Sequence, residues 1–401
     1  MSKTLLKNAT IASSNQGETS GSVLIEQKGI AAIGAPATDL VSVDAVDLSG
    51  TYLLPGFIDI HNHGAVRHDV NASTAEELLE VAAFLARNGV TTWVPTLVPD
   101  SDENYARVIG EIDRLMELQE GKPVAQAFGV HYEGVFANEA MCGALRPRYF
   151  RNFAGAENHP VSETPTPLLR KEGSLLPRLK KGVHMTTLAP EVEGGIDLIK
   201  HLVGEGWIVS IGHTRADAKT LDAAFEAGAR HLTHFFNAMT GMHHRDIGVA
   251  GWGLSRSGVT FDIIADGIHV APQMLELACR IKGTDRVSLI SDSVAPTGLG
   301  DGEFDVWGEK ISVTNGCTRN ERGSIAGSVI TMRDAVKRML SLGFSKDEVS
   351  EMASANPAKL LGLEKEIGSI QIGKSADLVA IDEDGNIKFV FIGGEPVSIQ
   401  N

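Results

Sequence analysis

Short runs of β-branched and other apolar residues recur along the middle of the chain, and each is followed by a stretch with helical spacing of apolar positions. This alternation is typical of parallel strands that are connected by helices. Eight parallel strands close a TIM (β/α)8 barrel. We therefore predict an α/β fold with barrel strands near residues 57–61, 90–94, 124–133, 183–188, 207–212, 230–234, 259–265 and 286–292.

The stretches between these runs carry helix start and stop signals. The clearest predicted helix spans 74–88. Ser73 or Thr74 can cap its first turn, and Gly89 can end it. The segment 146–181 has five prolines and little periodicity, so we predict a long loop over the barrel mouth. The other predicted helices span 103–119, 196–204, 216–227 and 272–282.

The two ends of the chain differ from the middle. Residues 1–54 and 366–401 contain short alternating strands separated by glycine turns, and neither end alone could close a sheet core. We therefore predict that the ends pair as one small β-sandwich domain. The barrel domain then spans 55–365 and is entered at Pro55-Gly56.

Composition narrows the functional classes. The chain has 401 residues, of which 43% are hydrophobic and 22% charged, as expected of a globular protein with a large core. A formal net charge of −15 leaves no basic face for a phosphate backbone, so we expect neither nucleic acid nor an anionic membrane as a partner.

The N-terminal sequence and the cysteines bear on where the protein works. The first residues lack an apolar signal core, and no apolar run reaches about 18 residues. The three cysteines, Cys142, Cys279 and Cys317, are odd in number and widely spaced, which argues against a disulfide framework. We expect a cytoplasmic protein.

Ligand-type side chains stand where the predicted strands end, which is where TIM-barrel active sites lie. His61 and His63 are two positions apart in an extended run, so both rings can face one cation. A lone His-x-His pair is weak evidence, but four further residues occupy equivalent strand ends. They are Glu133, His213, His234 and Asp292.

This donor set points to a reaction class. Imidazole and carboxylate ligands suit Zn²⁺ or Fe²⁺ better than Mg²⁺ or Ca²⁺. Such an ion lowers the pKa of water and polarises a carbonyl, and the carboxylate of Asp292 can move the proton. The sequence therefore predicts a metal-dependent hydrolase.

Several motifs carry a family resemblance that covers nearly the whole chain. The run Pro-Gly-Phe-Ile-Asp-Ile-His-Asn-His-Gly at 55–64 resembles the opening motif of the amidohydrolase superfamily. Later motifs resemble those of the N-acetylglucosamine-6-phosphate deacetylase family. They are His-Tyr-Glu-Gly at 131–134, Leu-Ala-Pro-Glu at 188–191, Ile-Gly-His-Thr at 211–214, His-Phe-Phe-Asn-Ala-Met at 234–239, Ala-Asp-Gly-Ile-His-Val at 265–270 and Asn-Pro-Ala at 356–358.

The resemblance implies a division of the metal ligands. Glu133, His213 and His234 match the primary metal site, which implies one divalent ion. His61 and His63 match the type that holds a second ion, with Glu133 bridging the two. Two ions per chain are then within its capacity.

The resemblance also implies a substrate and the residues that hold it. The substrate would be a phosphorylated, acetylated amino sugar, with N-acetylglucosamine 6-phosphate giving glucosamine 6-phosphate and acetate. Asp292 matches the general base and then acid, and His269 matches a residue that contacts the sugar and can polarise the acetyl carbonyl. Asn237, the Ala238 backbone and Arg245 match the group that holds the sugar phosphate. A homodimer is implied, in which a neighbouring chain could complete the phosphate site.

One departure from the family pattern bears on specificity. The family has a Gly-Ala-His run at a substrate-contacting position where this chain has Gly, Ala144 and Leu145. Leu145 has lost a polar contact, and a site built around a hydrogen bond discriminates strongly when that partner is removed. Arg146 and Arg148 could supply replacement contacts, although each could equally be a solvated loop residue.

Two alternatives remain open. A related amidohydrolase acting on a different N-acyl amino sugar, such as N-acetylgalactosamine 6-phosphate, or on another N-acyl compound would keep the ligand set and change the substrate contacts. A catalytically silent binding protein would be expected to lose Asp292 or a ligand, and all are present. A carboxylated lysine bridge is disfavoured because the third predicted strand ends on Glu133.

Overall fold

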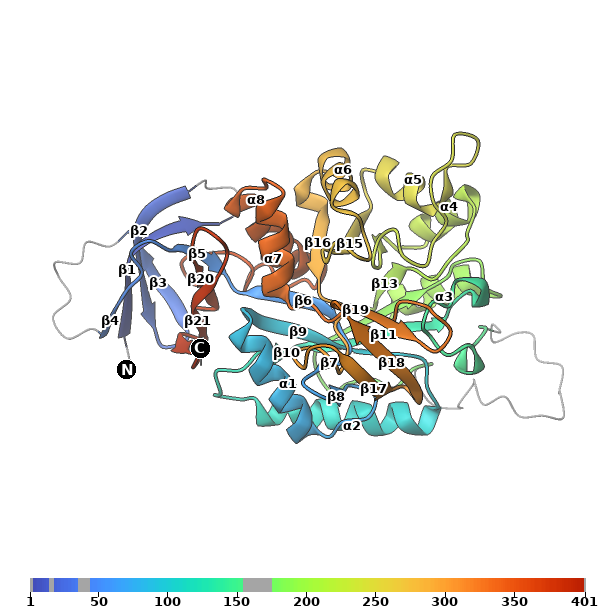
Figure 1. The fold of residues 1–401 in the computed structure, drawn as a ribbon, viewed down its shortest axis with the longest axis horizontal. Coiled ribbons are helices and arrows are strands. Elements are labelled where there is room, and N and C mark those ends of the chain that lie inside the picture. Colours follow the sequence, from blue (N-terminus) through green and yellow to red (C-terminus); the bar gives the residue numbers. More distant parts are fainter. Residues whose placement is uncertain (1–2, 14–17, 35–43, 154–174, 400–401) are drawn as a thin grey trace.

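The computed structural model describes residues 3–13, 18–34, 44–153 and 175–399. Figure 1 shows two parts along the longest axis, a large helix-covered barrel and a smaller sheet that contains both chain ends. The middle of the predicted 146–181 loop, at 154–174, lies outside the described residues. The predicted combination of a parallel barrel with a terminal sheet domain is confirmed.

The barrel is a nearly closed ring of parallel strands. The strands follow one another in the order in which they occur in the chain, and the first strand, β6, pairs with β9. The two ends of the ring approach at a parallel bridge between Asn62 and Ser293. The strands are β6 (Phe57–Asn62), β9 (Val90–Leu97), β11 (Gly129–Phe136), β12 (Val183–Leu188), β13 (Ile208–Ile211), β14 (His231–Leu232), β15 (Thr260–Ile264) and β16 (Val287–Ile290).

All eight predicted strands are present, with small differences at their ends. The third, expected over 124–133, is divided into β10 (Gln126–Ala127) and β11, and both pieces pair with β9. Five of the barrel strands, β6, β9, β11, β14 and β16, are entirely buried, because side chains fill the ring on one face and helices cover the other.

All five predicted helices are present, each within two residues of its expected ends. Thr74, not Ser73, caps α1 through a capping box in which Thr74 and Glu77 bond each other's backbone amides. In the described part of the chain, no helix is long and apolar enough to cross a membrane. The helices are α1 (Ala75–Arg87), α2 (Asp102–Leu118), α3 (Gly195–Gly204), α4 (Ala218–Glu226), α5 (Gly248–Ser255), α6 (Pro272–Lys282), α7 (Met332–Ser341), α8 (Lys346–Ser350) and α9 (Asn356–Leu360), with a π-helix at η5 (Glu351–Ala355) and short 3-10 turns at η2 (Glu139–Met141), η3 (Pro147–Tyr149) and η4 (Thr284–Arg286).

Two small antiparallel sheets stand at the C-terminal ends of the barrel strands and were not predicted. One consists of β17 (Gly302–Val306), β18 (Glu309–Thr314) and β19 (Cys317–Asn320), which follow the last barrel strand. The other pairs β7 (Gly64–Ala65) with β8 (His68–Asp69), directly after the first barrel strand. Both sheets lie next to the functional residues described below.

The terminal domain is one eight-stranded sheet with its own apolar core. Its centre is β1, whose partner changes along its length from β4 to β5, so the sheet divides there. Because β5 also pairs with β20, the N-terminal and C-terminal segments form a continuous sheet. Its strands are β1 (Lys3–Ala12), β2 (Glu18–Glu26), β3 (Gly29–Ile33), β4 (Asp44–Asp47), β5 (Tyr52–Pro55), β20 (Leu378–Ile381), β21 (Ile387–Ile392) and β22 (Glu395–Pro396).

Candidate active site

Four histidines and two carboxylates meet at the C-terminal mouth of the barrel. They form two groups in which the ligand atoms all lie within 4.8 Å of one another. The first group is His61, His63 and Asp292, and the second is Glu133, His213 and His234. All six predicted ligand-type residues are therefore brought together, and all six are buried.

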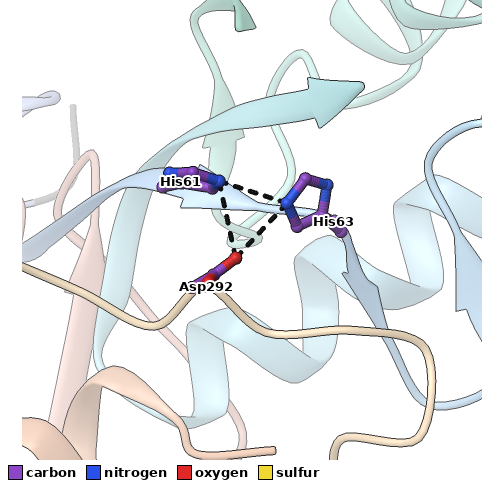
Figure 2. Close-up of side chains that lie close together, drawn as sticks. All are labelled: His61, His63 and Asp292. Atoms are coloured by element: carbon purple, nitrogen blue, oxygen red, sulfur yellow. Dashed lines mark hydrogen bonds and ion pairs between the residues drawn. The ribbon is translucent and has the colours of Figure 1, made fainter. Parts of the chain in front are cut away.

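The first group joins the two ends of the barrel ring. Figure 2 shows the rings of His61, in β6, and His63, directly after β6, turned toward the carboxylate of Asp292, which stands in the loop after β16. Oδ1 of Asp292 lies 3.4 Å from Nε2 of His61 and 3.3 Å from Nε2 of His63. The two Nε2 atoms are 3.1 Å apart, which places three donor atoms around one point.

The second group is centred on Glu133. Its Oε1 oxygen lies 3.0 Å from Nε2 of both His213 and His234. Its Oε2 oxygen lies 3.2 Å from Nε2 of His63, in the first group. One carboxylate therefore faces both groups, as a bridging ligand between two cations would.

The far nitrogens of two rings show which atom is free to bind a cation. Nδ1 of His63 lies 3.1 Å from the Thr96 carbonyl oxygen, and Nδ1 of His213 lies 2.8 Å from that of Met141. A carbonyl only accepts, so each Nδ1 carries a proton, and Nε2 is the nitrogen that presents a lone pair once the ring is neutral. The inward-facing nitrogens are thus the ones that a metal would use, and the residues fit one or two divalent ions.

The electrostatics of the site also call for positive charge. Burial opposes ionisation of Glu133, yet His61 and the bonds from His213 and His234 hold the pKa of its carboxyl well below the usual value. Burial likewise disfavours protonated His63, but Asp292 and Glu133 override it and raise the pKa of His63 to about 10. A divalent cation bound at these groups would take the place of the proton on His63 and would stabilise the two buried, ionised carboxylates.

Three of these residues stand in left-handed backbone conformations. The φ angles are 48° at His213, 34° at His234 and 49° at Asp292. Non-glycine residues adopt such angles at a cost, and surrounding bonds must hold them. The His234 amide donates to buried Asp262, and Asp292 is held by backbone bonds to His61 and Ser328 of 2.9 and 2.7 Å. Each ligand comes directly after a strand, where this turn aims its side chain into the barrel mouth.

A cavity of about 320 Å³ opens from the two groups. Three predicted substrate residues, Asn237, Ala238 and His269, line it on the side of β14 and β15. Two others, Ala144 and Leu145, line it on the side of β11. The cavity can hold a small polar molecule with one end at the ligand groups.

Other predicted residues lie away from this cavity. Arg245 is exposed and, among the described residues, does not line it. Arg146 pairs with Asp100 at 2.9 Å instead of facing the cavity. His131 is buried, and its Nε2 lies 2.7 Å from the Thr187 hydroxyl, so it packs inside the barrel.

The sequence analysis missed two residues beside the site. Trp307, between β17 and β18, lines the cavity, and its ring centroid lies 5.4 Å from that of His63. Asp69, in β8, accepts a hydrogen bond of 2.8 Å from the Trp307 indole. The available signal was local, because Trp307-Gly308 between two alternating runs is a two-residue hairpin turn.

Comparison with known proteins agrees with this geometry. The family model described as "Amidohydrolase family" matches residues 52–397. This chain belongs to the amidohydrolase family. The family is metal-dependent, which agrees with the two ligand groups.

Relatives of known name are similar over most of their length. The N-acetylgalactosamine-6-phosphate deacetylase of Escherichia coli O157:H7 is 33% identical over 363 residues, covering 90% of this chain and 92% of that protein. The N-acetylglucosamine-6-phosphate deacetylase of Bacillus subtilis (strain 168) is 31% identical over 398 residues, covering 96% and 97%. Both relatives are named as deacetylases of amino-sugar 6-phosphates.

Solved structures agree as closely. The N-acetylglucosamine-6-phosphate deacetylase of Pasteurella multocida superposes with a TM-score of 0.86 at 27% identity, over 98% of this chain and 99% of that one. A mutant of the Mycobacterium smegmatis enzyme, in complex with N-acetyl-D-glucosamine-6-phosphate, gives a TM-score of 0.84 at 29% identity, over 99% and 100%.

Proposed function

We propose that this amidohydrolase removes the N-acetyl group of an amino-sugar 6-phosphate, with N-acetylglucosamine 6-phosphate as the leading substrate and glucosamine 6-phosphate and acetate as products. The observation that carries the proposal is the position of Glu133, whose two oxygens face two histidine groups at the end of a cavity of about 320 Å³. The names of relatives that match nine-tenths or more of the chain support the substrate class.

We propose Zn²⁺ or Fe²⁺ as the metal. Glu133, His213 and His234 would hold the first ion, and His61 and His63 would hold a second together with Glu133. A bound ion would make water more acidic and polarise the acetyl carbonyl. A donor set of imidazole nitrogens and carboxylate oxygens supports a borderline-soft divalent ion over Mg²⁺.

We assign proton transfer to Asp292. Its carboxylate is buried at the cavity wall, and His61 and His63 outweigh the effect of burial and hold its pKa below the usual value, so it is ionised at neutral pH. It can therefore accept a proton from the attacking water and deliver that proton to the leaving amine. We assign His269 to the acetyl carbonyl or the sugar, since Nδ1 lies 2.6 Å from Asp266 and leaves Nε2 for substrate.

We propose that Asn237 and the Ala238 backbone hold the sugar phosphate, and that Arg245 contributes from a neighbouring chain in a homodimer. Arg245 stands in an exposed loop with Met242, whose exposed fraction is 66%. Nearby α6 exposes Leu277 and Ile281 by 44% and 54%. Apolar side chains exposed in this way are typical of an interface between subunits. Light scattering of wild type and of Leu277→Glu would test it, since the variant should shift toward the monomer.

One observation favours a second candidate, N-acetylgalactosamine 6-phosphate. Leu145 lines the cavity where the glucosamine family has a substrate-contacting histidine, so a polar contact to the substrate is absent there. The E. coli relative named for the galactosamine substrate is also 33% identical.

The remaining expectations about organisation are proposals as well. We propose domain limits of 1–54 with 366–401 for the sheet domain and 55–365 for the barrel, on the evidence that β5 pairs with β20 and so joins the two ends of the chain in one sheet. We propose a cytoplasmic location, which the odd number and wide spacing of the three cysteines support.

The deciding experiment is a substrate panel. N-acetylglucosamine, N-acetylgalactosamine and N-acetylmannosamine, each with and without 6-phosphate, would be assayed for acetate release with added Zn²⁺, Fe²⁺ or Mn²⁺. The proposal expects release from a 6-phosphate substrate that depends on metal. Activity that survives complete metal removal, or release only from compounds that are not amino sugars, would contradict it.

A further inference from the structure

Trp307 occupies a position that is costly for a large side chain. Val306 pairs with Glu309, so Trp307 and Gly308 form a two-residue turn, and their φ angles are 57° and 77°. A turn with two positive φ angles favours asparagine, aspartate or glycine at the first position. A tryptophan there is strained by sterics alone, so its contacts must hold it.

Those contacts direct the indole into the candidate active site. Its Nε1–H donates to Oδ2 of Asp69 at 2.8 Å, across 238 positions of sequence. Its ring lies edge-on to His63, with an interplanar angle of 80°. The β17–β18 hairpin is thereby fastened beside the first ligand group, and Trp307 forms part of the cavity wall.

Leu145 continues this wall toward the second ligand group. It is buried and packs with Val98 and Ala137, and Trp307 packs against the same cluster. Its Cδ1 would lie 2.2 Å from a Cβ placed on Gly134, the residue after Glu133. Trp307 and Leu145 therefore make a continuous apolar surface that reaches from His63 to Glu133, which we call the apolar wall.

The polar side of the cavity lies opposite the apolar wall, on the other side of the barrel mouth. The apolar wall stands over the ends of β6, β9 and β11, whereas Asn237, Ala238 and His269 follow β14 and β15. These two sets of strands lie on opposite sides of the ring. A substrate whose amide carbon reaches the ligand groups would place its hydroxyls and phosphate on the polar side and its acyl group on the apolar wall.

We propose that Trp307 and Leu145 select the N-acyl group of the substrate and limit it to acetyl. The inference rests on the proposed deacetylase function and adds to it the residues that limit the length of the acyl chain. The indole, held by its hydrogen bond to Asp69, fills the part of the cavity beyond the methyl of the acetyl group. A longer acyl chain fits there only if the hydrogen bond or the ring is removed.

The test compares a series of N-acyl glucosamine 6-phosphates, with formyl, acetyl, propionyl and butyryl groups. The measured quantity is kcat/KM for each, in metal-loaded wild type and in Trp307→Ala, Trp307→Phe and Leu145→Ala. One methylene in an apolar pocket changes kcat/KM by about 10-fold or more. We expect Trp307→Ala to raise the propionyl-to-acetyl and butyryl-to-acetyl ratios by about that factor, with a smaller rise for Leu145→Ala.

A matched control distinguishes the loss of the apolar wall from the general effect of replacing a buried tryptophan. Trp252 in α5 is buried and also donates to a carboxylate, Asp222, at 2.8 Å, but it does not line the cavity. Trp252→Phe should leave every ratio unchanged. The partial exposure of Trp307 in a surface hairpin means that its truncation leaves the barrel core intact.

A binding measurement gives a second readout. In Asp292→Asn protein, which keeps substrate uncleaved, the tryptophan fluorescence should change when the N-acetyl or N-propionyl compound binds. The change should disappear when Trp307→Phe is added. Unaltered acyl ratios in Trp307→Ala together with an unaltered fluorescence response would overturn the acyl-wall proposal. If the wild type instead cleaves no member of the series, the deacetylase function itself fails and this inference with it.

Discussion

The Oε2 oxygen of Glu133 lies 3.2 Å from the Nε2 nitrogen of His63, although Glu133 is in β11 and His63 directly follows β6. The other oxygen of the same carboxylate lies 3.0 Å from His213 and His234. A monodentate ligand of a single ion would not need both oxygens aimed at separate histidine groups. We therefore expect metal occupancy of both groups to depend on Glu133.

Replacing this carboxylate with an amide should weaken metal binding at both groups. Glu133→Gln removes the negative charge and one of the two acceptor oxygens, so we expect metal affinity to fall by at least about 100-fold and deacetylation to be lost. Elemental analysis of dialysed protein measures the first effect. Glu139→Gln, an exposed glutamate in η2, is the matched control and should retain its metal. Unchanged stoichiometry in Glu133→Gln would refute the bridging role.

The effect of changing His63 should be confined to one group. His63→Asn removes one of the three donors that surround the first position, whereas the bonds of Glu133 to His213 and His234 do not involve it. We expect the stoichiometry to fall from two ions toward one per chain. His68→Asn, in the next strand, is the control, since its ring pairs with Glu80 outside the cavity. A protein that still binds two ions after the loss of His63 would show that the first group is not a metal site.

Asp292 should be needed for turnover more than for metal binding at the second group. Asp292→Asn keeps the size of the side chain but cannot accept a proton, so we expect kcat to fall by about 10²–10⁴-fold. At least one ion per chain should remain on Glu133, His213 and His234. Parallel measurement of kcat and metal content separates the two roles. Activity within a few-fold of wild type would exclude Asp292 as the proton carrier.

The features that could be predicted from the sequence are those that depend on the local pattern of apolar and polar residues. Barrel strands and helices were located because apolar periodicity is a local property, and the six ligand-type residues converge because parallel strands end on one side of the ring. The hydrogen bond between Trp307 and Asp69 could not be predicted, since it joins two loops 238 positions apart. The exposure of Arg245 could not be predicted either, because it depends on the path that the loop before α5 takes in the folded protein.

The same limit applies to the backbone at the site. Histidine and aspartate are enriched among non-glycine residues with left-handed conformations, but most histidines and aspartates do not adopt them, so the residue type alone does not mark His213, His234 and Asp292. The conformation follows from distant partners, such as the buried carboxylate of Asp262 beneath His234. The backbone conformation at the end of a strand thus depends on tertiary contacts, whereas the strand itself follows from the pattern of apolar residues in the sequence.

A pH-dependent contribution to stability should come from His184, in β12 on the far side of the barrel from the cavity. Burial, with a smaller contribution from Arg178, lowers its pKa to about 4, and its Nε2 accepts a hydrogen bond of 2.9 Å from the Leu179 amide. Because the folded pKa lies below the unfolded value near 6.5, the unfolded chain binds more protons between these values. The stabilisation is therefore complete above pH 6.5 and is lost as the pH falls from 6.5 toward 4.

Substitution of His184 by glutamine tests this sign directly. The glutamine side chain can still accept from the Leu179 amide but does not titrate, so the unfolding free energy of His184→Gln should fall less between pH 7.5 and 5 than that of wild type. The difference should be about 2 kcal/mol at most, and smaller to the extent that water reaches the ring. Urea denaturation at both pH values measures it, and His201→Gln, an exposed histidine of α3, should behave as wild type. Since both variants retain every metal-ligand candidate, a pH dependence identical in His184→Gln and wild type would mean that this histidine is protonated as easily in the folded protein as in the unfolded chain.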